Sequence, residues 1–304
     1  MKKIFTAIFL IPILLAPLNA AFSKDDAGTS AAPFLKLGAG ARAAAMGDAY
    51  VAVVNNADGV YWNPAALYDI EEFSFSAMHA VWFEDIYYDW ISYARNITFG
   101  TIGIGAQYLS YGTMKKTDST GAEISDFSPS DLAITLSYAN YIFGIPMGIS
   151  AKYVSLTIED SATAFAMDIG TKLSSEYNEF AFGFVIQNIG TKVKFINEED
   201  PLPLNIKTGI AYRASSTLLF SLDANAPIDN EPNAGIGIEY SKEINFDTYT
   251  AIRAGYNTKT KDISGLQGFS AGIGFRYFEY DFDYAYVPFG DLGQTHKISF
   301  SLKF

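Results

Sequence analysis

The residues able to perform chemistry are few in this chain of 304 residues. His79 and His296 are the only histidines, and there is no cysteine. A Ser-His hydrolase holds its histidine between a nucleophile and a carboxylate, and no sequence pattern gives either histidine such partners. Without cysteine there is no thiol nucleophile or thiolate metal ligand, and zinc has no adequate ligand cluster. We predict a protein that is not an enzyme and binds no metal or cofactor. An esterase using His79 or His296 is the alternative.

Four pairs of glycines separated by one residue are similar to phosphate-binding loops. None has the full loop spacing between a strand and a helix, and no Walker lysine follows, so the sequence disfavours nucleotide binding. The formal net charge of −12, from 21 basic and 33 acidic residues, disfavours binding to nucleic acid. The pairs are Gly38 with Gly40, Gly103 with Gly105, Gly235 with Gly237, and Gly272 with Gly274.

The N-terminal segment has the pattern of a secretory signal peptide. Lys2 and Lys3 precede an apolar run over residues 4–18, and Ala20 offers a small residue for cleavage. A membrane anchor would need a longer apolar stretch without the two prolines of this run. We therefore assign residues 1–20 to a signal peptide and expect the protein to function beyond the inner membrane.

The rest of the chain alternates between apolar and polar residues. In residues 297–304 every second residue is large and apolar, and residues 280–286 alternate in the same way. A period of two indicates β-strands. A soluble β-sandwich alternates too, but here tyrosines gather on the apolar face near the strand ends, and the other face carries Gly, Ser, Thr and charges. These tyrosines include Tyr108, Tyr138, Tyr240, Tyr256 and Tyr277.

This distribution is typical of an outer-membrane barrel, which has a lipid-facing apolar band with aromatic girdles and a polar interior. The sheet must close because hydrocarbon leaves no partner for an unpaired backbone group. We predict an all-β fold, a transmembrane antiparallel up-and-down barrel of about fourteen strands over residues 71–304, in the bacterial outer membrane. The strands are expected at residues 73–82, 86–96, 100–111, 131–141, 146–157, 165–173, 179–187, 204–213, 217–226, 233–240, 249–256, 268–277, 280–288 and 294–304.

The predicted connections alternate between short and long. Long links occur at residues 112–130, 188–203 and 257–267, whereas most links at the other end are short. Short periplasmic turns and longer outer loops are expected of this class, so both chain ends are predicted to be periplasmic. One link, residues 241–248, is longer than this rule expects. The final Phe304 resembles the signal read by the barrel-insertion machinery.

Residues 21–70 precede the first strand and are predicted to form a hatch inside the barrel. Residues 38–49 are mostly small, so they could pack in a lumen about fourteen strands wide. Asn63 followed by Pro64 favours a helix start, because Asn caps free amides and Pro suits the first helical position. We expect short helices in this hatch.

Residues 37–67 resemble the N-terminal hatch of FadL-like outer-membrane proteins, and especially the PorV/PorQ family. The segment begins GARAAAMGDAYVAV from Gly40 onward and ends YWNPAAL. The family pattern is GxRAxxMGxAxxAxxxDxxxxxWNPA, with an NPA motif shared across the superfamily. The residues that we assign to the hatch motif of this chain are Gly40, Arg42, Met46, Gly47, Asp48, Asn63, Pro64 and Ala65.

The resemblance implies two functions. PorV-type proteins act with the type IX secretion system, binding secreted proteins and passing them to a surface-attachment complex. FadL-type proteins carry hydrophobic molecules such as long-chain fatty acids across the outer membrane, but they are longer and have larger outer loops. By motif and length we favour the secretion role, in a monomeric barrel surrounded by outer-membrane lipid. A small-solute porin is a further alternative.

FadL-type transporters open sideways to lipid at a kinked third strand, as the resemblance implies. Here the third strand contains Gly103 and Gly105, and Gly112 follows it. Glycine permits a kink or bulge, so a lateral opening at this strand is one hypothesis. Small residues that line the barrel interior are the other.

Alternation directs several charged side chains into the lumen, where interstrand ion pairs would brace the wall, because charges facing lipid are costly. Arg276 is expected to pair with Asp281 or Asp283 on the next strand. In the hatch, Arg42 and Asp48 are expected to anchor the plug to the wall. The remaining inward charges are Lys152, Lys207, Arg213, Asp223, Glu239, Arg253, Lys297 and Lys303.

Overall fold

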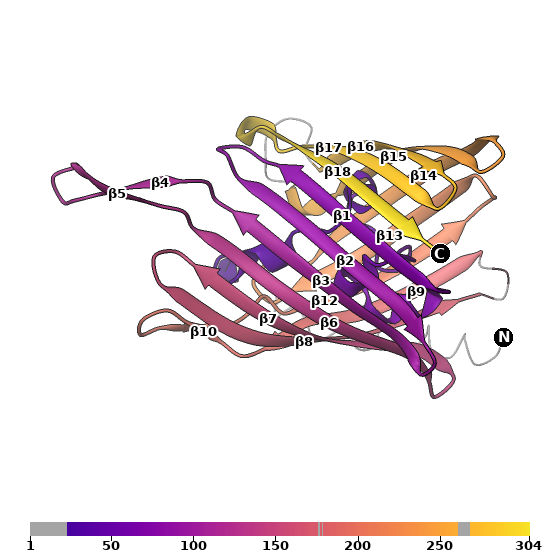
Figure 1. Ribbon diagram of the computed structural model, residues 1–304, viewed down its shortest axis with the longest axis horizontal. Helices are drawn as coiled ribbons and strands as arrows, with labels where there is room; N and C mark the ends of the chain where they lie inside the picture. Colours follow the sequence, from indigo (N-terminus) through magenta and orange to yellow (C-terminus); the bar gives the residue numbers. More distant parts are fainter. Residues whose placement is uncertain (1–22, 176, 178, 261–267) are drawn as a thin grey trace.

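A computed structural model describes residues 23–175, 177, 179–260 and 268–304. The predicted signal peptide, residues 1–20, lies outside this range. The described chain has two parts, a closed β-barrel and a hatch of short helices that lies inside it (Figure 1).

Fourteen antiparallel strands close the barrel, which confirms the predicted number. Each strand pairs with its neighbours along the chain, and β1 closes the ring with β18. The strands are β1 (Phe73–Val81), β2 (Tyr87–Ile97), β3 (Gly100–Ser110), β6 (Ser130–Ile142), β7 (Ile145–Thr157), β8 (Ser161–Ser174), β9 (Phe180–Gly190), β12 (Asn205–Arg213), β13 (Leu218–Pro227), β14 (Asn233–Asn245), β15 (Thr248–Asn257), β16 (Phe269–Tyr277), β17 (Tyr280–Pro288) and β18 (Gln294–Lys303).

Two small hairpins lie within the long connections and were not predicted. The first is β4 (Met114–Thr117) with β5 (Glu123–Phe127), and the second is β10 (Val193–Lys194) with β11 (Glu199–Asp200). The β4–β5 hairpin extends beyond the barrel at the end opposite to the C-terminus (Figure 1).

The link that seemed too long is part of a strand. Strand β14 continues to Asn245 and β15 begins at Thr248, so only two residues form the turn. The predicted length of this strand was too short, because Lys242 and Glu243 near the turn interrupt the apolar pattern.

The two ends of the barrel differ in their connections. At one end, the turns β2–β3, β6–β7, β14–β15 and β16–β17 have two residues each; we call this the short-turn end. At the other, the long-loop end, connections such as residues 111–129 and 191–204 are much longer. Phe304 lies at the short-turn end, where its N–H donates to Phe73 O at 2.9 Å.

The first described residues lie at the opposite end from Phe304. Ala31 N–H donates to Pro201 O at 2.9 Å, and the Lys36 ammonium lies 2.5 Å from Asp229, both in long-loop connections. The chain therefore passes through the lumen as the hatch before it enters β1. This arrangement was not foreseen, and the periplasmic placement of the N-terminus stays a prediction because residues 1–22 lie outside the description.

Burial follows the alternation along each strand. In β8, inward residues from Ala162 to Lys172 are buried, while Phe165, Met167 and Ile169 face outward and are exposed. A continuous apolar outer surface matches a lipid-facing wall. Among the helices of the described chain, none is long and apolar enough to cross a membrane.

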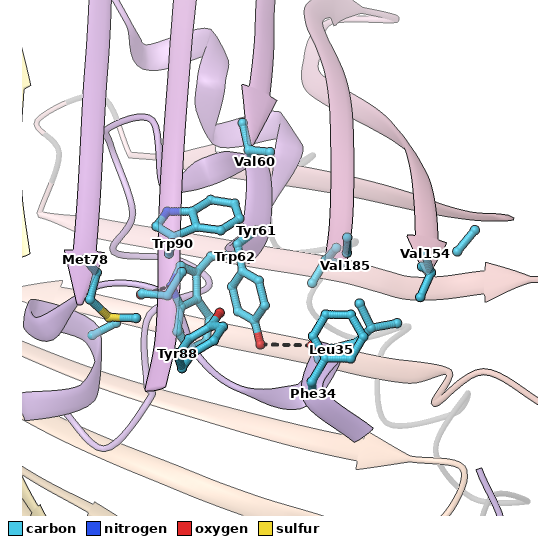
Figure 2. Packing of buried hydrophobic residues seen from close by; sticks show 14 of the residues in the cluster. Phe34, Leu35, Val60, Tyr61, Trp62, Met78, Tyr88, Trp90, Val154 and Val185 are labelled. Atoms are coloured by element: carbon cyan, nitrogen blue, oxygen red, sulfur yellow. Dashed lines mark hydrogen bonds between the residues drawn. The ribbon is translucent and has the colours of Figure 1, made fainter. Parts of the chain in front are cut away.

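Within residues 23–70, the described part of the hatch, there are five short helices: η2 (Lys24–Asp26), η3 (Pro33–Lys36), α2 (Ala41–Ala45), α3 (Gly59–Trp62) and η4 (Pro64–Asp69). Its aromatic residues form the main core with the wall. Tyr61 packs edge-on against Trp62 at 5.0 Å and against Trp90 of β2 at 6.0 Å, and its hydroxyl donates to Leu35 O (Figure 2). Two further short helices, η5 (Thr258–Thr260) and η6 (Gly290–Leu292), lie in the long-loop connections.

Candidate functional site: the hatch and its seat

The NPA segment forms a capped turn. The Asn63 side chain accepts a hydrogen bond from Ala65 N–H at 3.1 Å, and Pro64 takes the first position of η4. The predicted helix start is therefore present, although the helix is 3-10 in type. Asn63 Nδ2 also donates to Thr171 O at 3.0 Å, which joins the cap to β8.

Wall glycines receive this turn. A Cβ atom on Gly148 would overlap the backbone of Pro64 and Ala65, and one on Gly170 would overlap Asn63 Oδ1. Both glycines are on inward positions of β7 and β8, so they let the hatch backbone approach the wall closely. Neither was singled out from the sequence, because their partners lie about 80 to 110 residues earlier in the chain.

The segment around α2 is seated in the same way on the other side of the lumen. A Cβ on Gly272 would lie 2.5 Å from Ala45 Cβ, and one on Gly237 would lie 2.7 Å from Met46 Cβ. Gly47 itself has φ +66, and its N–H donates to Ser270 Oγ at 3.2 Å. The hatch thus contacts glycines on opposite sides of the barrel, which indicates a fixed plug rather than a loose one.

A side chain placed at one of the wall glycines that contact the hatch should displace the hatch. In the Gly183→Val variant, the new Cβ would lie 2.6 Å from Val51 O, an atom of the hatch backbone that cannot move alone. We expect a loss of about 1–3 kcal/mol in stability and faster protease cleavage within residues 50–54. Urea unfolding and limited proteolysis of the refolded barrel measure both. Ala224→Val, on the outward face of β13, is the control and should behave as wild type.

Arg42 connects the hatch to the wall by a two-pronged ion pair. Its Nε and Nη2 donate to Glu239 Oε2 and Oε1 at 2.7 and 2.8 Å. Burial alone would lower the pKa of Arg42. The Glu239 carboxylate and the other acidic groups nearby together outweigh this effect, so the pKa of Arg42 is well above its usual value. Glu239 is also bound by Arg253 at 2.5 Å, and Arg253 reaches Asp283 at 2.5 Å. The predicted anchoring role of Arg42 thus has a defined partner, which the sequence did not identify.

Asp48 has no such wall partner among the described residues. Its Oδ1 is buried without a hydrogen bond, and its backbone φ is +59. The anchoring carboxylate is Asp223 of β13, whose Oδ2 accepts from Tyr50 N–H at 2.8 Å and Val51 N–H at 2.9 Å. Here a carboxylate of the wall binds the backbone of the hatch, whereas we had expected the Asp48 carboxylate of the hatch to bind the wall.

Asp58 is a buried hatch residue that sequence reasoning missed. Trp90 Nε1 of β2 donates to its Oδ1 at 2.9 Å, and burial raises the pKa of its carboxyl group. The family pattern places its Asp seven residues before Asn63, where this chain has Asn56, so the motif gave no signal at Asp58.

The glycines of the third strand also serve the hatch. Strand β3 pairs without interruption with β2 and with β6. A Cβ on Gly103 would lie 2.8 Å from Val60 Cγ2 of the hatch, and one on Gly105 would lie 3.0 Å from Val60 Cγ1 and 2.6 Å from the ring of Trp90 in the wall. Gly112 follows the strand in the long connection, with φ +74. These features argue against a lateral opening at β3 and support the alternative of small inward residues.

The lumenal charges pair along the wall. Arg276 binds Asp281 through both carboxylate oxygens at 2.7 and 2.9 Å, while Asp283 binds Arg253 instead. The two histidines lie on the outer face, away from the hatch. His79 Nδ1 is 2.7 Å from Asp89, and His296 Nδ1 is 2.7 Å from the Tyr284 hydroxyl. No metal-binding group of three or more His, Cys, Asp or Glu residues occurs in the described chain.

A family model described as type IX secretion system protein PorV matches residues 20–227, about two thirds of the chain. The chain belongs to the PorV family. The predicted PorV/PorQ resemblance is therefore confirmed, and the protein is an outer-membrane β-barrel. A comparison with curated proteins found no match.

Solved structures show the same fold at low identity. The toluene transporter TbuX of Ralstonia pickettii is 13% identical, with a TM-score of 0.60; the alignment covers 88% of this chain and 98% of that one. The toluene transporter TodX of Pseudomonas putida is 11% identical, with a TM-score of 0.55, over 87% and 96% of the two chains. The fold class predicted from the alternation is confirmed by these neighbours.

Proposed function

We propose that this member of the PorV family is a non-enzymatic component of type IX-like secretion that binds protein partners at its long-loop end. The proposal is carried by one observation: the hatch fills a barrel whose wall is continuous, while the chain builds extra structure outside the lumen. Such a barrel suits a scaffold or shuttle better than a conduit. In this role it would receive secreted proteins or bind a surface-attachment complex.

The filled lumen is the first part of this argument. The NPA turn and α2 rest on glycines of opposite walls, and the ladder at β3 is unbroken. Three cavities beside the hatch have about 210 Å³ near Arg42, 390 Å³ near Lys172 and 100 Å³ near Lys297. Charged side chains line all three, which disfavours the passage of a long apolar molecule. The alternative, transport of hydrophobic molecules, is supported by the fold it shares with toluene transporters, but it requires the hatch or the wall to open.

The β4–β5 hairpin is the second part. Its two strands are joined by a ladder and by an ion pair between Lys115 and Glu123 at 2.6 Å, and Lys116 contacts Glu159 of the β7–β8 loop at 2.6 Å. Two apolar side chains of the hairpin, Met114 and Ile124, are exposed. An ordered projection with exposed apolar residues is suited to protein contact.

Removing the hairpin should abolish partner recovery without unfolding the barrel. A tagged chain is extracted from its own outer membrane in mild detergent, and bound molecules are identified by mass spectrometry. We expect secreted proteins sharing a C-terminal domain, or surface-attachment components, with the intact chain. A variant with residues 114–127 replaced by a Gly-Ser linker should lose them.

The control is Phe246→Ser, which removes an exposed apolar side chain in the two-residue turn at the short-turn end. It should keep the partners. Equal recovery with and without the hairpin contradicts the proposed docking region, and bound apolar molecules without those proteins favour the transporter.

A further inference from the structure

A pair of adjoining cavities lies at the long-loop end of the lumen, between the hatch and the wall. They have about 100 and 40 Å³ and share Lys36, Asp48, Asn257 and Lys259 in their linings. This is space for a small polar group and a few waters, and too little for an extended chain. Both lie on the long-loop side of α2.

Three lysines from different wall elements line these cavities. Lys207 of β12 and Lys297 of β18 are each only 6% exposed, whereas Lys259, in η5, is exposed. None of the three lies within 4.0 Å of a carboxylate oxygen among the described residues. Lys297 Nζ donates one long bond to Gly38 O at 3.4 Å.

The nearby negative charge does not balance them. Asp48 is the one described carboxylate that lines both cavities, and its Oδ1 has no hydrogen-bond partner. Lys36 is already paired with Asp229 at 2.5 Å. Asp223, whose Oδ2 accepts from the hatch backbone, also lies close enough to interact with Lys207. The three lysines therefore outnumber the two carboxylates beside them, in a chain whose net charge is −12. Buried charges without partners are costly, so a site that concentrates cations in an acidic protein is suited to an anion.

The rest of the lining supplies amide donors and aromatic surface. Asn257 lines both cavities, and Asn205, Asn225 and Asn233 line the smaller one. The Lys207 ammonium lies over the rings of Trp62, at 4.8 Å, and Tyr61, at 5.5 Å. These contacts hold its charged end beside the cavity without neutralising it.

We propose that the junction of the two cavities binds one oxyanion, the phosphate or carboxylate of a small ligand, beside Lys259 and between Lys207 and Lys297. The site is separate from the Arg42–Glu239 ion pair and from the β4–β5 hairpin. The anion would bind whether or not the barrel carries a secreted protein.

The test uses the full folded chain in detergent, titrated with sodium phosphate or sodium acetate at constant ionic strength against sodium chloride. Trp62 and Trp82 line the cavities, so tryptophan fluorescence reports occupancy. We expect a saturable change with phosphate, acetate or both, absent with chloride, and a higher unfolding temperature at saturation. A response to phosphate alone assigns a phosphate group, and a response to acetate alone assigns a carboxylate. No saturable response to either anion overturns the proposal.

Lysine variants separate an anion site from a structural brace. Lys259→Met and Lys207→Met should weaken anion affinity at least tenfold. Without anion, the unfolding temperature should not change in Lys259→Met, because Lys259 is exposed, and should stay the same or rise in Lys207→Met, because a buried unpaired charge is removed. Lys115→Met, on the exposed hairpin, should retain the wild-type response. If Lys207→Met lowers the unfolding temperature but leaves anion affinity unchanged, the lysine is a brace and the anion site is refuted.

Discussion

Replacing Arg42 with alanine is expected to turn a sealed barrel into one that leaks ions. Arg42 is the hatch side chain that forms a two-pronged ion pair with the wall, at 2.7 and 2.8 Å to Glu239. In the variant the Glu239 carboxylate keeps its ion pair with Arg253 at 2.5 Å. The wall therefore has no unpaired charge, and only the hatch loses a contact. Removing one partner of a buried charge pair costs about 2–5 kcal/mol. If 2–3 kcal/mol of this cost favours a state in which the hatch has left its position, the population of that state rises roughly 30- to 150-fold.

The position of Arg42 makes the leak path specific. The cavity of about 210 Å³ near Arg42 lies toward the short-turn end of α2, and the cavity of about 100 Å³ near Lys297 lies on its other side. Helix α2 separates them. Loss of the Arg42 side chain both enlarges the first cavity and frees the helix that closes the second, so the two spaces would join into a polar path.

Planar-bilayer recordings of the purified variants measure this effect. Arg42→Ala should show frequent openings where the wild type is closed, and Arg42→Lys should fall between them because an ammonium cannot form the two-pronged contact. Arg276→Ala is the control, since Arg276 binds Asp281 of the neighbouring strand and not the hatch. Unchanged conductance in Arg42→Ala would show that the wall glycines, the Asp223 hydrogen bonds and the Lys172–Asp69 ion pair hold the plug without Arg42.

The barrel was predictable because lipid and lumen impose opposite demands on successive residues. Strand β17 alternates Tyr280, Phe282 and Tyr284 with Asp281 and Asp283, and its observed bounds equal the predicted ones. Where this contrast weakens, prediction fails. In β14 the last residues before the two-residue turn include charges outside the apolar band, and the strand was ended too early.

The hatch shows which contacts can be predicted from residues that are neighbours in the sequence. The Asn63 cap depends on the two residues that follow, so the sequence revealed it. The partners of Arg42 and Ala45 lie on strands about 200 residues later, at Glu239 and Gly272. No spacing rule connects such positions, because they meet only after the barrel has closed. The wall glycines therefore looked like features of a strand, although their role is to receive the hatch.

A second large effect is expected from the ion pair between Lys152 and Asp168 on neighbouring strands β7 and β8. Lys152 Nζ lies 2.7 Å from Asp168 Oδ2 and donates to Asn188 Oδ1 at 2.8 Å, and Asn188 N–H donates to Asp168 Oδ1 at 2.8 Å. The side chains of the pair are 2% and 0% exposed. The group lies at an irregularity in the β8–β9 pairing, where Asn188 has φ +62. The ion pair thus satisfies groups that regular pairing leaves free.

Lys152→Met should cost about 3–5 kcal/mol, because it leaves Asp168 as a buried charge without its cation. With an m-value of about 3 kcal/mol/M, the urea midpoint of the barrel in lipid vesicles would fall by about 1–2 M. Adding Asp168→Asn should recover most of this loss, since the amide oxygen still accepts from Asn188 N–H and no net charge remains buried. Lys115→Met breaks an exposed pair and should cost no more than about 1 kcal/mol. If Lys152→Met costs as little as this control, water reaches Asp168, and the hatch does not keep that side of the lumen dry.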